Sequence, residues 1–486
     1  MRRTRLSFSA RSFPRGAVVL GTVALAVPLA VPAGAAGQPA AERSVVPLPA
    51  ADVPIEAPVL TTTPTGQEDS DLLLTSPQVG SMRGMAVYEN SGELVYWQEG
   101  PYQNLSQVTY QGEPALSVYR FTESGGECLL LDSSYTEIAS FSVAGTPTDG
   151  HDCQYSPDGS RVLLIGFRQH TYDLSEYGGL PDATLIEPVV QERDLDTGEI
   201  TFEWSGLDHV PVDETQRPLT DEVVDYMHVN SLAYDTDGNL LVSARTTSTV
   251  YKIDIDTGEV LWRFGGKASD FAFADPADAP SHQHDARRLP DGRLTVFDNG
   301  NHREPLVSRG AAYELDEQAM TAELVEDLRP SEGAFVPFAG SNREVADGNQ
   351  LVSFGDTGEI IEFGGPSGTE PVFTATFPED PVTLSYRAER ATDWEGTPAE
   401  PPTTDWSAPD ADGGRELTMS WNGATEVDRW LVEAGSSAHC LDVLGSVSRS
   451  GYATAAEVRV PEDAGFFRVS ALDARGRVLG SSTGSL

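Results

Sequence analysis

Short runs of apolar residues, interrupted by Gly, Asp and Pro, recur along most of this chain. Examples lie at residues 84–88, 92–97 and 115–119. No long stretch places apolar residues at the three- and four-residue spacing of an amphipathic helix. Short β-type segments at regular intervals are typical of a fold that is built from repeated β units. The pattern therefore predicts an all-β protein.

Three histidines open matching segments of this repeat, and each segment continues as a hydrophobic stretch with an Asp-Gly turn. A fourth turn of the same kind follows without a histidine. The turns recur at the spacing of β-propeller blades, so residues 59–392 provide roughly six blades. Because the inner strands of a propeller converge on one channel, we expect the histidines to gather there. The histidines are His151, His228 and His284, and the turns are Asp158-Gly159, Asp237-Gly238, Asp291-Gly292 and Asp347-Gly348.

Two further segments repeat each other closely. Asp-x-Asp-Thr-Gly occurs at residues 194–198 ahead of Trp204 and at residues 254–258 ahead of Trp262. We expect each to form a turn between outer strands, with the tryptophan packed between blades. The wider spacing around residues 168–190 indicates one long insertion or an irregular blade.

The pattern changes near the C-terminus. Residues 393–414 are rich in Asp, Pro, Thr and Gly and predict a linker. Residues 415–486 return to short strands and resemble a fibronectin type III or immunoglobulin-like β-sandwich. Such a module is usually structural or adhesive, so contact with a cell surface or a glycan is the role we consider for it. The predicted architecture is a six-bladed β-propeller followed by a small C-terminal β-sandwich.

The N-terminal residues have the pattern of a signal peptide. Five arginines between Arg2 and Arg15 precede an apolar run at residues 16–30 and a group of small residues, which predicts cleavage near residue 35. The alternative is a membrane anchor, although two prolines interrupt the run and it is short for a span. We expect residues 1–35 to be a signal peptide and residues 36–58 a flexible lead-in. The mature protein would then be secreted, without stable membrane insertion.

The net charge of the chain limits the classes of molecule that it can bind. The sequence has 32 basic and 75 acidic residues, which gives a formal net charge of −43. Such a charge argues against nucleic acid or an anionic membrane surface as a partner. A small anionic substrate would need a local positive pocket made of arginine and histidine.

The cysteines are Cys128, Cys153 and Cys440. An exported protein with three cysteines can form one disulfide. We favour Cys128–Cys153, because these residues lie in neighbouring expected blades and would brace the wall beside His151. The alternative, in which all three thiols are reduced and buried, stays open at this point. No Cys-x-x-Cys pair is present, which disfavours a zinc ribbon or a redox dithiol.

Residues 191–328 resemble the arylsulfotransferase family of the six-bladed-propeller type. A weaker resemblance extends from about residue 55 to residue 390. The segments that carry it are QERDLDTG at 191–198, FEW at 202–204, LDHVP at 207–211, HVNS at 228–231, LVSAR at 241–245, GEVLWRFGG at 258–266, QHDAR at 283–287 and FDNG at 297–300.

The resemblance implies transfer of a sulfuryl group from a phenolic sulfate ester to a phenolic acceptor. The transfer would pass through a sulfated histidine and need no nucleotide sulfate donor, no cofactor and no metal. The matching positions make His284 the nucleophile, with His151, His228 and Arg245 around the sulfate. Candidate substrate-binding residues are Asn230, Gln283 and His209, the last at the rim.

These residue types suit the chemistry. A neutral imidazole is a competent nucleophile when its other nitrogen is held by an acceptor, for which Asp285 or a backbone carbonyl would serve. Arg245 offers planar donors that match sulfuryl oxygens. His151 and His228 could donate to the same oxygens or move the proton of the phenol. Alternatively, the histidines are structural and Arg245 forms a buried ion pair with an aspartate.

Two other functions are compatible with the same histidines. The first is a non-catalytic secreted propeller that binds a ligand or carbohydrate. The second is a metal-dependent hydrolase or lyase in which the histidines are metal ligands. Metal content would separate the second from the sulfotransferase, and turnover of a chromogenic aryl sulfate would separate the first.

Overall fold

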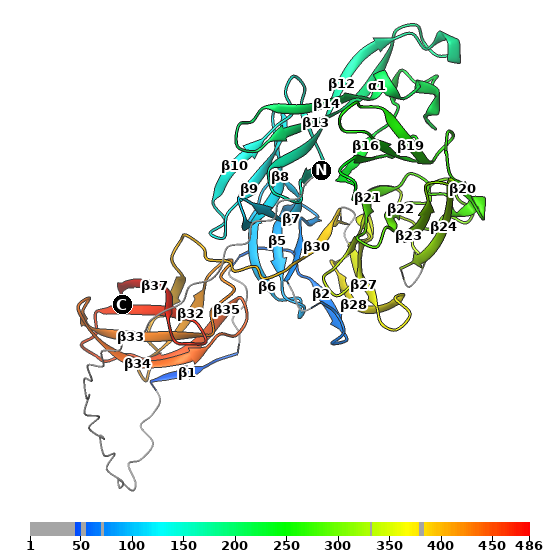
Figure 1. The fold of residues 1–486 in the computed structure, drawn as a ribbon. Coiled ribbons are helices and arrows are strands. Elements are labelled where there is room, and N and C mark those ends of the chain that lie inside the picture. Colours follow the sequence, from blue (N-terminus) through cyan, green and yellow to red (C-terminus); the bar gives the residue numbers. More distant parts are fainter. Residues whose placement is uncertain (1–43, 50–54, 70–71, 331–332, 379–382) are drawn as a thin grey trace, which may run out of the picture. The chain divides into compact units, whose positions relative to one another are not determined.

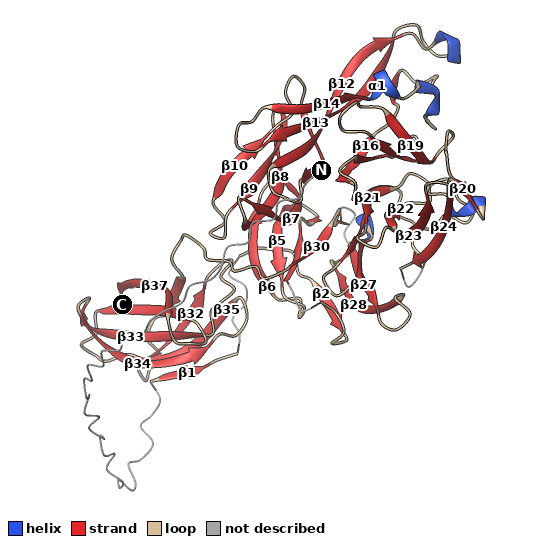
Figure 2. Cartoon of the chain, viewed as in Figure 1, coloured by secondary structure: helices blue, strands red, loops and turns tan. Residues whose placement is uncertain are grey.

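The computed structural model describes residues 44–49, 55–69, 72–330, 333–378 and 383–486. The expected signal peptide at residues 1–35 lies outside them. The described chain is almost entirely β, as Figure 2 shows. No helix in these ranges is long and apolar enough to cross a membrane. The short helices are η1 (Ser175–Tyr177), α1 (Gly206–His209), η2 (Val212–Glu214), η3 (Pro276–Asp278) and η4 (Gly355–Thr357).

Within the described residues, six mainly antiparallel sheets form a ring of blades, which confirms the predicted β-propeller (Figure 1). The first strands of neighbouring blades contact one another. Four blades are consecutive in sequence. The first of these blades contains β7 (Tyr102–Tyr110), β8 (Glu113–Thr122), β9 (Gly125–Leu131) and β10 (Glu137–Phe141), and the second contains β11 (Thr148–Tyr155), β12 (Arg161–Tyr172), β13 (Ala183–Asp194) and β14 (Ile200–Ser205). The third contains β16 (Val229–Tyr234), β17 (Leu240–Ala244), β18 (Thr249–Ile253) and β19 (Val260–Gly265). The fourth contains β21 (His284–Arg288), β22 (Leu294–Asp298), β23 (Arg309–Asp316) and β24 (Thr321–Leu328).

The other two blades close the ring by joining distant parts of the chain. In one, the late strand β30 pairs with the early strand β3 in the order β30-β3-β5-β6. In the other, β2 adds to the outer edge of the sheet by pairing with β28. Their strands are β2 (Thr61–Pro64), β3 (Leu72–Thr75), β4 (Gln78–Val79), β5 (Met82–Tyr88), β6 (Leu94–Glu99), β25 (Ser341–Glu344), β26 (Gln350–Ser353), β27 (Glu359–Gly364), β28 (Glu370–Thr376), β29 (Thr383–Leu384) and β30 (Ala388–Ala391).

The Asp-Gly pairs connect the first and second strands of four blades, as the repeat predicted. Gly238 and Gly292 have φ values of 87° and 94°, which glycine adopts without steric cost. The preceding aspartate accepts the amide hydrogen two residues ahead, for example from Arg293 to Asp291 at 3.0 Å. The repeated dipeptide is therefore a local turn signal that marks successive blades.

Large aromatic side chains fill the space between blades. Trp204, which is fully buried, packs with Tyr251 of the next blade in one apolar cluster. Trp262 packs with Tyr313 in the following one. Both tryptophans therefore lie between blades, as expected.

The insertion near residue 168 is a long β-hairpin. β12 and β13 have 12 residues each and pair along their whole length, so the hairpin extends beyond the shorter β14 (Figure 1). The chain then returns through α1 and η2 to β15 (Val223–Asp225), which pairs in parallel with β13. This return ends three residues before His228 and therefore leads into the candidate site.

The C-terminal region is a β-sandwich of two four-stranded sheets that share one core. The structure differs from the expected boundaries, because β1 comes from the expected lead-in and β31 from the expected linker. The partner strand of β1 is not adjacent to it in the sequence, so no local pattern predicts β1. The sheets are β1-β35-β32-β31 and β34-β33-β36-β37, with β1 (Val45–Pro47), β31 (Thr403–Trp406), β32 (Gly414–Ser420), β33 (Arg429–Ser437), β34 (Cys440–Ser448), β35 (Ala453–Arg459), β36 (Phe466–Leu472) and β37 (Val478–Ser485). The fibronectin or immunoglobulin type stays a prediction.

Candidate active site

Three successive blades bring His151, His228 and His284 together. His151 lies in β11, His228 directly before β16, and His284 at the start of β21. Arg245 follows β17 and completes the group. All four line one pocket of about 470 Å³. Its remaining lining residues are Gln103, Phe121, Asp149, Gly150, Phe338, Ala339, Leu384 and Tyr386.

Each histidine lies at an irregular point of its strand. The register of the first strand shifts between Thr148 and Cys153, between Val229 and Ser231, and between His284 and Arg287. His228 itself has a φ of 51°, and Asp285, next to His284, has a φ of 54°. Bulges of this kind redirect side chains that regular pleating would send elsewhere. The propeller therefore departs from ideal strands where the histidines meet.

Two of the histidines are each held by a carboxylate. His151 Nδ1 forms a short contact with Asp149, whose Oδ1 also accepts the His151 backbone amide at 2.9 Å. His228 Nδ1 lies 2.5 Å from Asp225 Oδ2. Burial alone would lower the pKa of His151, but the charge and hydrogen bond of Asp149 outweigh burial and raise it. His151 is therefore suited to carry a proton in the pocket.

His284 has a different partner. Its Nδ1 lies 2.6 Å from the amide oxygen of Asn299. The Asn299 amide nitrogen donates to the carbonyls of Val336 and Ala339, at 2.8 and 2.9 Å. These two bonds orient the amide so that its oxygen faces the ring, and His284 Nδ1 must donate. The lone pair of the neutral ring is then on Nε2.

The protonation state of His284 follows from its surroundings. The residue is 2% exposed. Burial, and then the positive charges of Arg245, His151 and His228, lower its pKa well below the usual value, although the Asn299 hydrogen bond acts in the opposite direction. His284 is therefore a neutral imidazole, whereas His151 next to it favours the protonated form. Such a separation of pKa values assigns base and acid roles within one pocket.

Arg245 brings a positive charge to the pocket. Its guanidinium donates to the Pro337 carbonyl at 2.9 Å, while its buried Nε has no hydrogen-bond partner among the described residues. Arg245 forms no ion pair with any residue that the structure describes, so the alternative of a buried pair with aspartate is wrong. In a chain with a net charge of −43, an unpaired arginine among histidines is suited to bind an anion.

The other side of the pocket is apolar. Phe121, Phe338 and Leu384 line it, and Phe338 is 49% exposed. The ring of Tyr386 stands edge-on to the rings of His151 and His284, with both centroids at 5.9 Å. Its buried hydroxyl has no hydrogen-bond partner among the residues that the structure describes. The pocket thus combines a charged end with an apolar wall, as a ligand with an anionic group on an aromatic ring requires.

Three predicted substrate-binding residues lie outside the pocket lining. Asn230 and Gln283 are fully buried, and Asn230 donates to the Gln283 carbonyl at 2.8 Å. Gln283 in turn donates to Ser243 Oγ at 3.0 Å. His209 stacks on Trp204, with ring centroids 5.3 Å apart. In this structure all three make contacts within and between blades.

The orienting partner expected for His284 was also wrong. Asp285 points away from the ring and binds Arg343 through both oxygens, at 2.7 and 2.8 Å. Asn299 lies directly after β22, in the FDNG segment at residues 297–300, but its spacing from His284 does not indicate this contact. The carboxylates of Asp149 and Asp225 had a weak signal, since each precedes its histidine by two or three residues.

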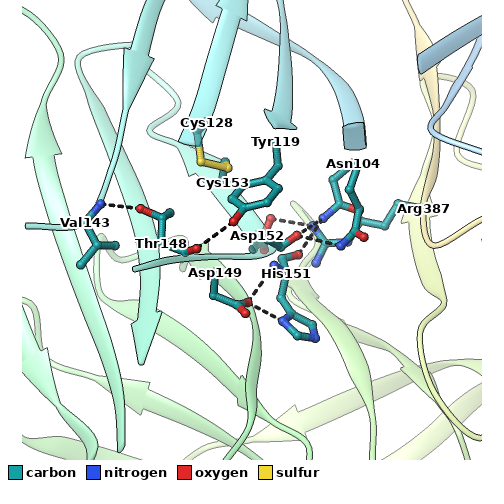
Figure 3. Close-up of a disulfide and its surroundings, with 12 residues drawn as sticks. Asn104, Tyr119, Cys128, Val143, Thr148, Asp149, His151, Asp152, Cys153 and Arg387 are labelled. Atoms are coloured by element: carbon teal, nitrogen blue, oxygen red, sulfur yellow. Dashed lines mark hydrogen bonds and ion pairs between the residues drawn. A yellow bond between two sulfur atoms is a disulfide. The ribbon is translucent and has the colours of Figure 1, made fainter. Parts of the chain in front are cut away.

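The predicted disulfide between Cys128 and Cys153 is confirmed and joins β9 to β11. Cys440 is free and exposed, so the alternative with all three thiols buried is wrong. Figure 3 shows the disulfide beside the segment of β11 that carries His151. Tyr119 donates to the Thr148 carbonyl at 2.7 Å, and Asn104 donates to the His151 carbonyl at 2.9 Å. The backbone on both sides of Asp149 is therefore held from the preceding blade.

The described residues contain no group of three or more His, Cys, Asp or Glu that could hold a metal ion. Fold and pocket together define a β-propeller whose inner strands bring three histidines and an arginine to one pocket. Residues 122–376, more than half of the chain, match the family described as arylsulfotransferase (ASST). The chain belongs to the arylsulfotransferase family.

Comparisons with curated proteins and solved structures add no argument about this chain. A search of curated proteins gave no match. Solved structures that align with the chain include a protein of unknown function from Bacteroides caccae, with 15% identity, a TM-score of 0.41, and coverage of 65% of this chain and 97% of that one. A streptogramin B lyase has 9% identity, a TM-score of 0.36, and coverage of 66% and 88%. The Dos1 propeller has 12% identity, a TM-score of 0.30, and coverage of 78% and 75%.

Proposed function

We propose that this protein transfers a sulfuryl group from an aryl sulfate to a phenol through a covalent sulfohistidine at His284. One observation carries the proposal. Asn299 holds a neutral His284 with its Nε2 lone pair free, in a pocket that also contains the unpaired guanidinium of Arg245. A nucleophile and an anion-binding cation in one pocket are what attack on a sulfate ester needs.

In the first half-reaction, His284 Nε2 forms a bond to the sulfur. The bond between sulfur and the phenolic oxygen breaks, and its electron pair leaves with that oxygen. The proton that the departing phenolate takes up comes from His151, which Asp149 favours in its protonated form. The aromatic part of the donor lies against the apolar wall of the pocket.

In the second half-reaction, the hydroxyl oxygen of an acceptor phenol attacks the sulfur. The nitrogen–sulfur bond breaks, its electron pair returns to His284 Nε2, and the phenolic proton passes to His151. The two half-reactions are mirror images, so one pocket serves donor and acceptor in turn. Negative charge on the sulfuryl oxygens is stabilised in both steps by Arg245 and His228, and one such donor is worth on the order of 3 kcal/mol of barrier.

The test is the intact mass of the purified protein after brief exposure to nitrophenyl sulfate without acceptor. Wild type should gain one sulfuryl group and lose it when phenol is added. His284→Ala should gain none. His439→Ala is the matched control, because His439 is exposed and belongs to the sandwich. No adduct on wild type, with no release of nitrophenol from several donors, would overturn the proposal in favour of a binding propeller.

We also propose that the protein is exported. The support is the signal-like pattern at residues 1–35 and the disulfide, since disulfides persist in oxidising compartments. N-terminal sequencing of the protein from culture medium would give a start near residue 36. An uncleaved N-terminus in the membrane fraction would favour an anchor instead.

A further inference from the structure

Arg387 lies directly before β30, the strand that closes the propeller, and it contacts the strands of three other blades. Its guanidinium donates to Asp152 Oδ1 at 2.6 Å and to the Asn230 carbonyl at 3.1 Å, and its Nε lies 3.6 Å from Asp285 Oδ1. The side chain is 3% exposed. Figure 3 shows it approaching Asp152 from the side opposite the disulfide. One buried arginine thus joins four blades.

Each group that Arg387 contacts lies within two residues of a site histidine in the sequence. Asp152 follows His151, Asp285 follows His284, and Asn230 comes two residues after His228. Successive side chains of a strand point in opposite directions, so an anchored neighbour fixes the direction in which the histidine points. The irregular register at these positions leaves the directions less determined by the ladder itself.

Other arginines bind the same carboxylates as Arg387. Arg287 binds Asp152 and Asp285 at 2.9 and 3.0 Å, and Arg343 binds both oxygens of Asp285. Asp152 and Asp285 therefore keep ion-pair partners when Arg387 is replaced, so we expect the variant to fold. Replacement of Arg387 removes a side chain that contacts residues near all three histidines at once.

We propose that Arg387 is a positioning residue, which sets the mutual placement of His151, His228 and His284 from the closing blade. This inference rests on the proposed function, because it assigns these histidines to one reaction. It explains why the segment before β30 binds the inner strands instead of only pairing with β3. A displacement of about 1 Å in a reacting group is enough to cost on the order of 100-fold in rate.

The experiment compares Arg387→Met and Arg387→Lys with a matched control on the same strand. Arg390 of β30 is also buried and paired with a carboxylate, Glu362 of β27 at 2.8 Å, and it donates to Asn90 Oδ1 at 2.6 Å. Arg390→Met therefore removes a buried ion pair of the same type. Sulfuryl transfer is measured per folded molecule, with kcat and KM separated. The histidine ring protons are titrated in parallel by NMR.

We expect Arg387→Met to lose about 100-fold in kcat with KM nearly unchanged, and Arg390→Met to keep kcat within about threefold of wild type. If Arg387→Met does not fold, Arg387→Lys tests the positioning role instead. It keeps the charge but cannot bind three groups at once, so we expect a loss of about tenfold. Equal losses in the Arg387 and Arg390 variants, or full kcat in Arg387→Lys, would overturn the inference.

The NMR titration does not depend on turnover. His151 is faced by Asp149, Asp225, His228 and Arg387, of which Arg387 lowers its pKa and the two carboxylates raise it. Arg387→Met should raise the pKa of His151 and shift the ring resonances of all three histidines, whereas Arg390→Met should leave them in place. If wild type transfers no sulfuryl group, the proposed function fails, and unchanged ring resonances would then overturn this inference separately.

Discussion

The amide oxygen of Asn299 lies 2.6 Å from His284 Nδ1, and both amide hydrogens of Asn299 are committed to backbone carbonyls. This relationship determines which nitrogen of His284 is free. An amide accepts a hydrogen bond without adding negative charge, so it orients the ring and still leaves a neutral imidazole. The carboxylate of Asp149 has the opposite effect on His151, because its charge and hydrogen bond favour a protonated ring.

The first prediction concerns Asn299, the hydrogen-bond partner of His284. Asn299→Asp places a carboxylate at Nδ1 and should raise the pKa of His284, so that a larger fraction is protonated and cannot attack sulfur. We expect kcat to fall most at pH 6 and to recover as the pH rises. Pre-steady-state release of nitrophenol across pH measures this. Asn239→Asp, on the turn between β16 and β17, is the control. A profile that keeps its wild-type shape would contradict the tautomer assignment.

The second prediction concerns the alkaline limb of the rate. The pKa of His151 is raised above its ordinary value of 6.5, so the acid form is present below that pKa and is lost as the pH rises through it. Asp149→Asn removes the carboxylate, lowers the pKa of His151 and should move the alkaline limb to lower pH. Donors with poor leaving groups should be affected most, because they depend most on the proton.

The control for this variant is Asp182→Asn, an exposed change outside the pocket. The pH dependence of kcat/KM should be the same in Asp182→Asn as in wild type. An alkaline limb that stays in place in Asp149→Asn would mean that another group supplies the proton.

The third prediction separates stability from activity at Arg245. Because Arg245 has no ion pair among the described residues, Arg245→Met removes an uncompensated, partly buried charge and breaks no salt bridge. Thermal stability should be equal to wild type or higher, while transfer should fall by on the order of 100- to 1,000-fold. Calorimetry and kinetics on the same preparation test both halves.

Arg415→Met is the matched control for Arg245→Met. Arg415 also donates to a backbone carbonyl, that of Ser407 at 3.2 Å, but it belongs to the sandwich. Its loss should leave transfer unchanged. A marked loss of stability in Arg245→Met would show that this arginine serves the fold and not an anion.

The sequence predicted much of this arrangement because its signals are local. Asp237-Gly238 and Asp291-Gly292 are turns that four consecutive residues determine, and they recur once in each of several blades. A histidine at the same point of successive repeats must approach the common axis. The meeting of His151, His228 and His284 therefore follows from the repeat and the fold class alone.

The unpredicted parts depend on long-range pairing. β1 joins β35 across about four hundred residues, and its three residues have no pattern of their own. Asn299 follows β22 and Tyr386 precedes β30, and no spacing along the chain links either residue to His284, although Asn299 belongs to the FDNG segment at 297–300. Gln283 is adjacent to His284 in sequence, but it lies directly before β21 and donates to Ser243 Oγ in the core at 3.0 Å.

The last prediction concerns Tyr386, whose buried hydroxyl has no partner beside two site histidines. Burial raises its pKa far above the usual value, so the hydroxyl stays protonated and acts as a hydrogen-bond donor. Tyr386→Phe removes that donor and no existing hydrogen bond. Stability should therefore stay within about 1 kcal/mol of wild type, while kcat should fall by on the order of 100-fold if the hydroxyl meets the transferring group.

A series of donors with different leaving phenols locates the contact. A loss that grows with the pKa of the leaving phenol places the Tyr386 hydroxyl at the departing oxygen, and a uniform loss places it at a sulfuryl oxygen. Tyr155→Phe is the control, because Tyr155 is a buried tyrosine of β11 that does not line the pocket. Equal kcat in Tyr386→Phe and wild type would mean that the tyrosine only shapes the pocket wall.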